Sequence, residues 1–353
     1  MNLNTNTPGP QQSEARLRLI QCGVGGHGAS WVPVAGASPD FDVVAIVDVV
    51  PANLEKAAAV ANLPATRRFS SLEAALDAVE ADAILTVTPP AVHLPHARLA
   101  FERGLHLMTE KPFADTLENA REMLRLSQAA GKKLVVSQNY RYFKPFHTLR
   151  GLFEAKAAGD YGHGHLDFYI PGDFTGTFRE AMEFPLLIDM AIHHIDLIRA
   201  LLGQNIARVT AFSFKPSWSW FQHEPGLKMV LEMEDGTPFS YSGDWSARGR
   251  STSWSGNWRL QCSNGALHLE NDRVFVSKSD TWMKNESVEE VPLAALELDS
   301  TRGTLGAFAR SIRSGQDAQT SGADNIHSLA TVFAAVKSAQ EKRSVEVREV
   351  LEG

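Results

Sequence analysis

The spacing of apolar residues changes partway along this 353-residue chain, at about position 143. Before that point, short apolar runs alternate with segments in which apolar residues recur every three or four positions, as in strands that alternate with helices. The pattern predicts strands over 17–22, 43–47, 83–87, 105–108 and 134–138, and helices over 28–37, 51–61, 72–79, 93–103 and 117–130. Such alternation predicts a doubly wound parallel sheet.

Later in the chain a different period dominates. An apolar helix is predicted over 184–202, and after it apolar and polar residues alternate along short segments such as 227–233. Asp235-Gly236 and Asn264-Gly265 are hairpin signals, and a last amphipathic helix is predicted over 325–340. We therefore expect an open, mostly antiparallel sheet with helices on one face, which makes the second part of the chain α+β.

A glycine-rich turn, Gly23-Val24-Gly25-Gly26-His27-Gly28, separates the first predicted strand from a helix, and Asp48 ends the next strand. This G-x-G-x-x-G pattern with an acid about twenty residues later is the dinucleotide fingerprint. The pyrophosphate would lie on free N–H groups at the helix N-terminus. A glycine-rich turn in an unrelated α/β domain is the alternative. We predict a flexible tail at 1–15, a Rossmann domain at 16–142 and a substrate-binding and oligomerisation domain at 143–353.

Composition narrows the choice of partners. The net charge is −7, with 44% hydrophobic and 21% charged residues, and nucleic-acid or anionic-membrane binding would need a basic face. A small molecule is therefore the expected partner, without nucleic acid or membrane. The two cysteines suggest no disulfide framework, and the polar N-terminus lacks a signal peptide, so we expect a cytoplasmic protein.

Polar segments end three of the predicted strands. They are Thr88-Pro89-Pro90, Glu110-Lys111-Pro112 and Gln138-Asn139-Tyr140-Arg141. Because ligands of doubly wound sheets lie outside the carboxyl ends of the strands, all three segments are expected to line the cofactor crevice. Lys111 could donate to a substrate oxygen and stabilise charge that develops there. The alternative is an ordinary solvated lysine.

The predicted helix over 184–202 supplies a second set of candidates. Asp189 and His193 are spaced i, i+4 and share a face, so the carboxylate could orient the ring and make His193 a general base. An ordinary pair on the helix surface is the alternative. His193 and His194 diverge by about 100° on a helix, so we expect no metal site there.

Taken together and in order, these segments resemble the glucose–fructose oxidoreductase / inositol dehydrogenase / rhizopine-catabolism (Gfo/Idh/MocA) family over nearly the whole chain. The motifs that carry the resemblance are Gly23-x-Gly25-x-x-Gly28, Thr88-Pro89-Pro90 with His93, Glu110-Lys111-Pro112, and 189–196 leading to Leu201-Leu202-Gly203. The resemblance implies an NAD(P)-dependent dehydrogenase that acts on a secondary alcohol or ketone of a sugar, inositol or related polyol. It also implies a homodimer or homotetramer formed through the second-domain sheet.

The resemblance also assigns roles to particular residues. His193 would remove the hydroxyl proton, Lys111 would stabilise the alkoxide, and Asp189 would orient His193 or another substrate hydroxyl. Asn139 and Arg141 join these three as expected substrate contacts. The expected cofactor contacts are Gly23, Gly25, Gly26, His27, Gly28, Asp48, Thr88, Pro89, His93, Glu110 and Lys111.

Asp48 favours NAD over NADP, because its carboxylate can accept from both ribose hydroxyls and would repel a 2′-phosphate. Arg67 and Arg68 are the nearby candidates for binding that phosphate. Two other functions stay open: an NAD-assisted glycoside hydrolase or lyase of the same fold, and a non-catalytic regulator that binds NAD or sugar.

Three features depart from the family pattern or stay ambiguous. The stretch 182–188 before Asp189 is bulkier than is usual in the family, and His27 and Trp31 replace smaller residues. The tryptophans could face a sugar, or pack in the sheet core and a subunit contact. The five concerned are at positions 218, 220, 245, 254 and 258.

Overall fold

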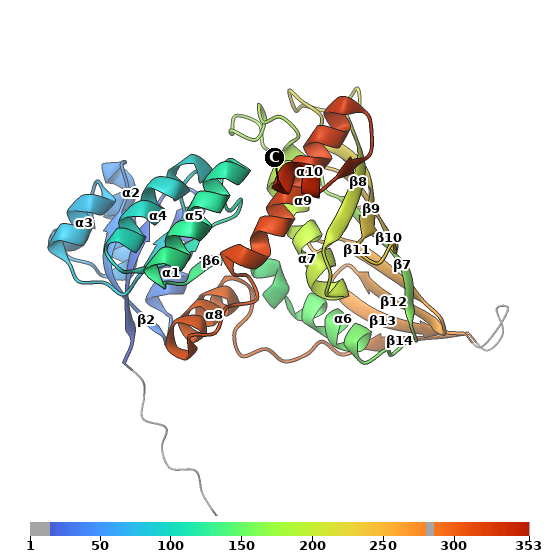
Figure 1. Cartoon of the computed structure of the whole chain (residues 1–353), viewed down its shortest axis with the longest axis horizontal. Helices are drawn as coiled ribbons and strands as arrows, with labels where there is room; N and C mark the ends of the chain where they lie inside the picture. Colours follow the sequence, from blue (N-terminus) through green and yellow to red (C-terminus); the bar gives the residue numbers. More distant parts are fainter. Residues whose placement is uncertain (1–14, 280–285, 353) are drawn as a thin grey trace, which may run out of the picture.

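A computed structural model describes residues 15–279 and 286–352. Residues 1–14 of the tail expected at 1–15 lie outside them. The described chain forms two layered units side by side, each with its own sheet (Figure 1). No helix within these residues combines the length and the apolar character needed to cross a bilayer.

The first unit contains the predicted doubly wound sheet. Its six strands are parallel, in the order β3-β2-β1-β4-β5-β6. They are β1 (Leu17–Cys22), β2 (Phe41–Val47), β3 (Arg68–Phe69), β4 (Ala83–Thr86), β5 (His106–Thr109) and β6 (Leu134–Val136). The strand order reverses between β1 and β4, and in such sheets the crevice at the reversal is where ligands bind.

Helices cover both faces of this sheet, as the alternating pattern predicts. They are α1 (His27–Gly36), α2 (Pro51–Ala61), α3 (Leu72–Ala78), α4 (His93–Glu102) and α5 (Leu117–Ala130). Local sequence fixes both ends of α5. The Thr116 side chain accepts from the Asn119 N–H at 3.1 Å and caps its N-terminus, and Gly131, at φ 63°, ends it. Helix α1 continues through Pro33.

The second unit contains a nine-stranded sheet in the order β14-β13-β12-β11-β7-β10-β9-β8-β15. All its pairs are antiparallel except β7 with β10, so the expected open, mostly antiparallel sheet is confirmed. The strands are β7 (Tyr161–Tyr169), β8 (Ile206–Phe214), β9 (Gly226–Met233), β10 (Pro238–Asp244), β11 (Asn257–Cys262), β12 (Gly265–Glu270), β13 (Arg273–Lys278), β14 (Ser287–Val291) and β15 (Val345–Glu346).

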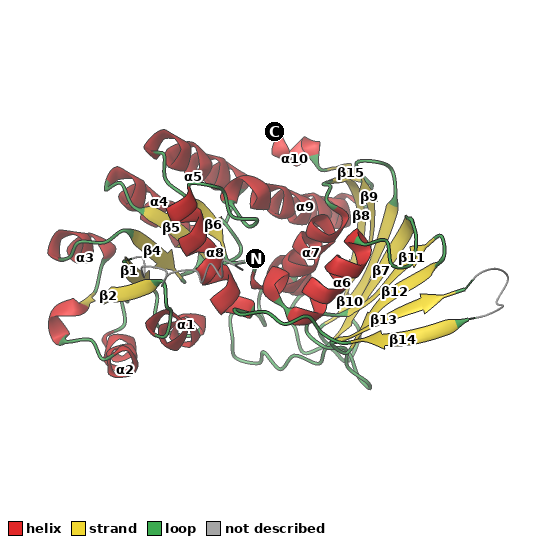
Figure 2. Cartoon of the chain, turned by 90° about the horizontal axis from the view of Figure 1, so that it is seen from below, coloured by secondary structure: helices red, strands yellow, loops and turns green. Residues whose placement is uncertain are grey.

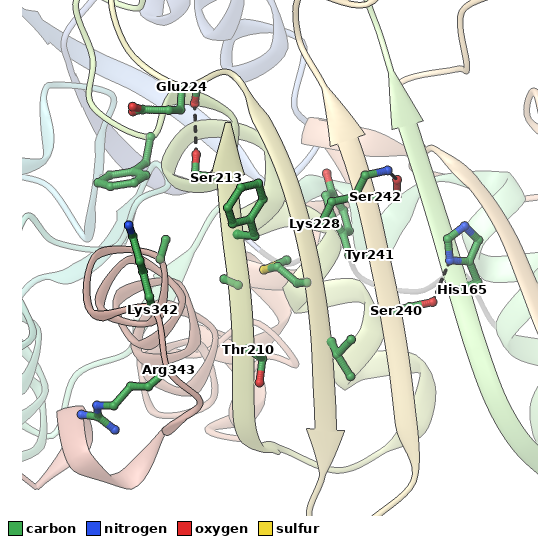
Figure 3. A pocket seen from close by; sticks show the side chains of 16 residues that line it. His165, Thr210, Ser213, Glu224, Lys228, Ser240, Tyr241, Ser242, Lys342 and Arg343 are labelled. Carbon is green, nitrogen blue, oxygen red and sulfur yellow. Dashed lines mark hydrogen bonds between the residues drawn. The ribbon is translucent and has the colours of Figure 1, made fainter. Parts of the chain in front are cut away.

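Helices cover only one face of this large sheet. Figure 2 shows α6 (Lys144–Glu154), α7 (Ile192–Leu202) and α9 (Gly322–Glu341) on the face toward the first unit, while α10 (Arg348–Leu351) follows β15. The opposite face carries a hollow of about 930 Å³ over β8, β9 and β10, shown in Figure 3. Phe212 and Val230, 61% and 54% exposed, contribute apolar surface to it.

Two features differ from the sequence expectations. The helix predicted over 184–202 is confirmed over α7, but the chain before α7 forms a π turn, Leu186–Ala191. Helix α8 (Ser300–Ser314), which was not predicted, packs on the first sheet, although 142 was the expected boundary between the domains. Phe308 stacks on Phe41 with ring centroids 5.8 Å apart, because the apolar face of α8 completes a core left open by β1 and α1.

Candidate active site

The turn after β1 has the backbone shape that the glycine fingerprint requires. Gly23 has φ 80°, and a Cβ there would lie 2.2 Å from the carbonyl oxygen of Val87. A Cβ on Gly28 would lie 2.2 Å from the carbonyl oxygen of Gly23. Any side chain at either position would therefore collide with backbone, so both glycines are needed to seat α1 against β1 and β4.

The N-terminus of α1 is shaped to receive an anion. Gly26 adopts φ 49° and ψ −124°, and a Cβ built on it would meet nothing within 4 Å. Its N–H and that of His27 have no acceptor among the described residues, and the first helical turn contains no acid. Unpaired N–H groups at the positive end of a helix dipole suit a pyrophosphate, so this turn fits the predicted cofactor.

Asp48, at the end of β2, is bonded to the same turn. Its Oδ2 accepts from the N–H groups of Val24 and Gly25 at 2.9 and 3.1 Å. Its Oδ1 accepts from the Val50 N–H at 2.8 Å and from Asn53 Nδ2 at 3.2 Å. Asp48 therefore organises the glycine turn in addition to the ribose role predicted from the sequence. Asn53 was missed, because an asparagine in the first turn of a helix carries no distinctive signal.

Glu110 links the end of β5 to α1. Its Oε1 accepts from Trp31 Nε1 at 2.8 Å and lies 3.3 Å from His27 Nε2, while its Oε2 accepts from the Lys111 N–H at 3.0 Å. Burial alone would raise the pKa of Glu110, but the His27 hydrogen bond and the charges of His27 and Lys111 hold it below its usual range. The two bulky residues that depart from the family pattern thus hold the carboxylate that precedes Lys111.

Lys111 and Asp189 meet across the boundary between the two units. Lys111 Nζ donates to Asp189 Oδ1 at 2.8 Å and to the Asp189 carbonyl oxygen at 2.7 Å, and the two side chains are 14% and 11% exposed. Arg179 Nε donates to the other carboxylate oxygen at 2.5 Å. Burial alone would raise the pKa of Asp189, but Lys111 and Arg179 hold it well below its usual range, so Asp189 is ionised.

The π turn explains how Asp189 offers two oxygens to one ammonium group. A π turn interrupts the regular ladder of main-chain hydrogen bonds, and such turns are frequent at functional sites. Here the turn spans Leu186–Ala191, and the carbonyl of Asp189 within it accepts from Lys111. Phe184, just before the turn, has φ 49°, so the bulky stretch enters it through a left-handed residue.

His193 is buried beside this pair but is oriented by a different residue. Its Nδ1 lies 3.1 Å from Gln138 Oε1, and the Tyr140 ring stacks on it at 4.4 Å with an interplanar angle of 11°. An amide oxygen only accepts, so this bond places the proton on Nδ1 and leaves Nε2 as an acceptor. Burial, and then the charge of Lys111, hold the pKa of His193 well below its usual range.

Asp189 therefore does not orient His193, contrary to the expectation from the sequence. The Asp189 carboxylate is engaged by Lys111 and Arg179, and Gln138 occupies Nδ1 instead. The contacts that Gln138 makes with His193 and Arg179 makes with Asp189 were not predicted from the sequence. Gln138 lay inside a segment already singled out at a strand end, whereas Arg179 lies in an irregular loop with no motif.

Arg141 requires a correction, because it was expected to contact substrate. Its guanidinium is buried, and each of its three nitrogens donates to protein oxygen: Nε and Nη2 to Asp196 at 2.6 and 2.7 Å, Nη2 also to Asp324, and Nη1 to the Gln319 carbonyl. Asp324 also binds Arg199, which extends the network from α7 to α9. Arg141 joins these helices and does not face the cofactor crevice.

We expect Arg141→Met to lower the free energy of unfolding by about 3–5 kcal/mol, because it leaves the buried Asp196 carboxylate without its main partner. Denaturant unfolding measures the loss. Arg150→Met, which removes a neighbouring guanidinium bonded at 3.1 Å to Gln319 Oε1, is the matched control and should cost about 1 kcal/mol or less. If Arg141→Met kept the wild-type stability but raised the substrate KM sharply, Arg141 would be a substrate contact after all.

The remaining candidates differ in their contacts and burial. His93 is fully buried and bridges the carbonyl oxygens of Phe113 and Thr88, each at 3.0 Å, so it supports the two strand-end loops from beneath. Pro89 caps the short helix that follows β4, and Asn139 Nδ2 lies 3.3 Å from Ser300 Oγ on α8. Of the tryptophans, 245 and 258 are core, while 218 and 254 are about half exposed.

Metal binding has no support in the described residues, where no three side chains of His, Cys, Asp or Glu gather closely enough to hold an ion. His194, the neighbour of His193, instead contacts the Tyr241 hydroxyl and the Trp254 carbonyl, each at 3.1 Å. It is a buried core histidine, and burial lowers its pKa to about 4.

Comparison with known proteins agrees with this architecture. Residues 17–138 match the model described as oxidoreductase family, NAD-binding Rossmann fold, and residues 146–268 match the GFO/IDH/MocA C-terminal domain. The chain is 27% identical over 350 residues to protein y4oX of Sinorhizobium fredii, covering 95% of this chain and 97% of that one. It is 26% identical over 341 residues to a D-apiose dehydrogenase of Paraburkholderia graminis, covering 94% and 89%.

A solved structure shows the same fold along nearly the whole chain. An oxidoreductase from Agrobacterium radiobacter, in complex with NAD+, L-tartaric acid and magnesium, aligns with a TM-score of 0.85 and 21% identity. The alignment covers 95% of this chain and 99% of that one. With a dinucleotide turn, a lysine–aspartate pair across two units and matches to both family models, the chain is a member of the Gfo/Idh/MocA family of NAD-binding oxidoreductases.

Proposed function

We propose that this oxidoreductase transfers hydride between NAD and a secondary alcohol carbon of a sugar or polyol. The observation that carries the proposal is the placement of the Lys111 ammonium group, 2.8 Å from Asp189 Oδ1 and close enough to His193 to depress its pKa. The name of one relative, D-apiose dehydrogenase, supports a sugar substrate. No observation favours the glycoside hydrolase or the non-catalytic regulator.

The first unit would hold the cofactor. The N–H groups of Gly26 and His27 would bind the pyrophosphate, Asp48 the adenosine ribose, and the strand ends at Thr88 and Glu110 would flank the nicotinamide. When bound, NAD supplies the ring that accepts or returns hydride. Arg68, one of the two arginines that could favour NADP, pairs with Glu55 at 2.9 Å and donates to the Leu63 carbonyl.

Lys111 and His193 would bind and deprotonate the substrate hydroxyl. His193 Nε2 takes the hydroxyl proton, because Nδ1 already carries one and the low pKa keeps the ring neutral before the reaction. The Lys111 ammonium group stabilises negative charge on the oxygen as the proton leaves. Asp189 fixes the direction of the ammonium through two bonds, and in the reductive direction the same groups act in reverse.

A substrate panel tests the proposal. Purified protein with NAD or NADP is offered alditols, inositols, aldoses and sugar acids, and the absorbance of the reduced nicotinamide is followed. Sustained reduction with one compound class supports a dehydrogenase. Cleavage of a glycoside without net reduced cofactor, or tight cofactor binding without any turnover, would contradict the proposal.

Asp48 gives a separate prediction about cofactor choice. We expect Asp48→Ala to weaken NAD binding about tenfold or more, because it removes both a charge-assisted ribose contact and the acceptor that orders the glycine turn. Asp48→Asn keeps an acceptor but loses the charge, so NADP should gain relative to NAD. The ratio of kcat/KM for the two cofactors measures this, and an unchanged ratio in both variants would refute the ribose assignment.

We also propose that the uncovered face of the large sheet forms a homodimer or homotetramer contact. The exposed Phe212 and Val230 and the hollow that they help to line support this, because isolated proteins rarely leave such apolar surface open. Sedimentation of the purified protein would give its oligomeric state. The two cysteines are buried free thiols, which fits the reducing cytoplasm that we propose as its compartment.

A further inference from the structure

Arg179 lies at the candidate active site without a role in the chemistry described above. It belongs to the loop over 170–185, between β7 and the π turn, and its Nε donates to Asp189 Oδ2. Lys111 binds the other oxygen of the same carboxylate. Asp189 therefore joins the two cations, and a ligand that contacts Lys111 lies within a few carbon atoms of Arg179.

The Arg179 guanidinium is held in a fixed orientation. Its Cζ lies 5.2 Å from the centroid of the Phe174 ring and 4.6 Å from that of Phe178, and both rings belong to the same loop. Cation–π contacts of this kind and the Nε bond together restrict the plane of the group. The terminal nitrogens Nη1 and Nη2 make no hydrogen bond within the described residues, where Asp189 is the one carboxylate paired with Arg179, and the side chain is 29% exposed.

The charges around Arg179 leave an excess of positive charge at this position. Lys111 and Arg179 share the single negative charge of Asp189, and His193 is neutral. The Glu110 carboxylate is engaged by Trp31, His27 and the Lys111 N–H. Glu180, the chain neighbour of Arg179, is turned back to accept from the Gly176 N–H at 2.7 Å. No carboxylate of the described residues thus meets the outer edge of Arg179.

We propose that Arg179 recognises a carboxylate of the substrate, so that the preferred substrate is a polyhydroxy acid. The planar guanidinium fork with two free nitrogens matches a carboxylate in bidentate geometry. The carboxylate would bind Nη1 and Nη2 while a hydroxyl elsewhere on the same molecule contacts Lys111 and His193. The inference rests on the dehydrogenase function proposed above and narrows its substrate class.

Matched acid and neutral substrates test the inference. Uronates are compared with aldoses, aldonates with alditols, and sugar phosphates are included to separate a carboxylate from a phosphate ester. We expect wild-type kcat/KM to favour the acids. Arg179→Gln should raise KM for the acids by about 10- to 100-fold, the range expected for losing hydrogen bonds to a charged group, and should shrink the ratio of acid to neutral kcat/KM by the same factor.

The ratio separates recognition from a merely structural role. Arg179 also bonds Asp189, so its loss can lower kcat, but that effect falls on acid and neutral substrates alike. Arg179→Lys keeps the charge without the fork and should recover only part of the preference. Arg248→Gln is the matched control: Arg248 lies 5.8 Å from the Trp218 ring, is exposed, and touches none of the proposed site residues.

Each outcome decides one of the two proposals. Equal turnover of acids and neutral partners, or a preference unchanged in Arg179→Gln, overturns the carboxylate assignment and leaves the dehydrogenase function standing. An Arg179-dependent preference for sugar phosphates also overturns it. If no compound reduces NAD, the dehydrogenase proposal fails, and calorimetric titration of the NAD-loaded protein with glucuronate and with glucose then tests the inference alone. Glucuronate binding by the wild type but not by Arg179→Gln supports the inference. Equal glucuronate binding by the two proteins overturns it.

Discussion

Replacing Lys111 with methionine is expected to lower kcat by about a thousandfold, the effect of removing a group that stabilises charge developing in the transition state. Methionine keeps the apolar stem and the packing but removes the ammonium group that lies between Asp189 and the proposed substrate oxygen. NAD affinity should change little, because the glycine turn and Asp48 provide the proposed anchors of the cofactor. Steady-state kinetics and NAD titration by fluorescence measure the two quantities.

Two comparisons make the Lys111 result specific. Lys278→Met removes an exposed lysine from the end of β13 and should leave kcat unchanged. Asp189→Asn should also lower kcat, because Lys111 keeps its carbonyl partner but loses the charged one. Wild-type turnover in Lys111→Met would remove the proposed mechanism altogether, while the family membership would stand.

The second large effect is expected at His193. His193→Asn should lower kcat about 10²- to 10⁴-fold, the usual contribution of a positioned general base. Because burial and the charge of Lys111 hold the pKa of His193 well below its usual range, the ring is already neutral around neutral pH. Wild-type kcat/KM should therefore fall only as the pH drops through that lowered pKa, and not near 6.5. A variant whose kcat stays at the wild-type value would show that His193 is not the base.

Gln138 offers a readout that a structural defect would not imitate. Gln138→Glu puts a carboxylate against Nδ1 of His193, which favours the charged ring and raises its pKa. The acid limb of the kcat/KM profile should then move to higher pH. In Gln138→Leu the tautomer is no longer fixed, so kcat should fall while the affinity for NAD is kept. A profile that is identical in all three proteins would separate Gln138 from the reaction.

The parts of the molecule that sequence could predict are those governed by local rules. Gly28 is required by the carbonyl of Gly23 five residues earlier, and Gly23 by its φ of 80°, and such local constraints leave a recognisable motif. The position of Lys111 could be predicted because the carboxyl ends of the parallel strands in a doubly wound sheet lie along the ligand-binding edge. The alternation of strands and helices in the first unit and the open second sheet follow from periodicity in the same way.

The parts that could not be predicted depend on contacts between distant segments. Arg141 occupies a strand end just as Lys111 does, yet its guanidinium turns toward Asp196 and Asp324, which lie 55 and 183 residues away. The i, i+4 spacing of Asp189 and His193 suggested a pair, but the π turn and two cations directed the carboxylate elsewhere. Tertiary packing decides which partners such side chains contact, and the spacing of residues along one helix does not predict that packing.

The position of α8 has a consequence for how the polypeptide can be divided. Trp31 and Phe41 belong to a core that also needs Leu305 and Phe308, contributed from near the other end of the sequence. A fragment cut after β6 would thus present bare aromatic rings to water, so the nucleotide-binding half is not a module that can be excised or swapped intact. On the ribosome, the core of this half stays incomplete until α8 (Ser300–Ser314) has been synthesised.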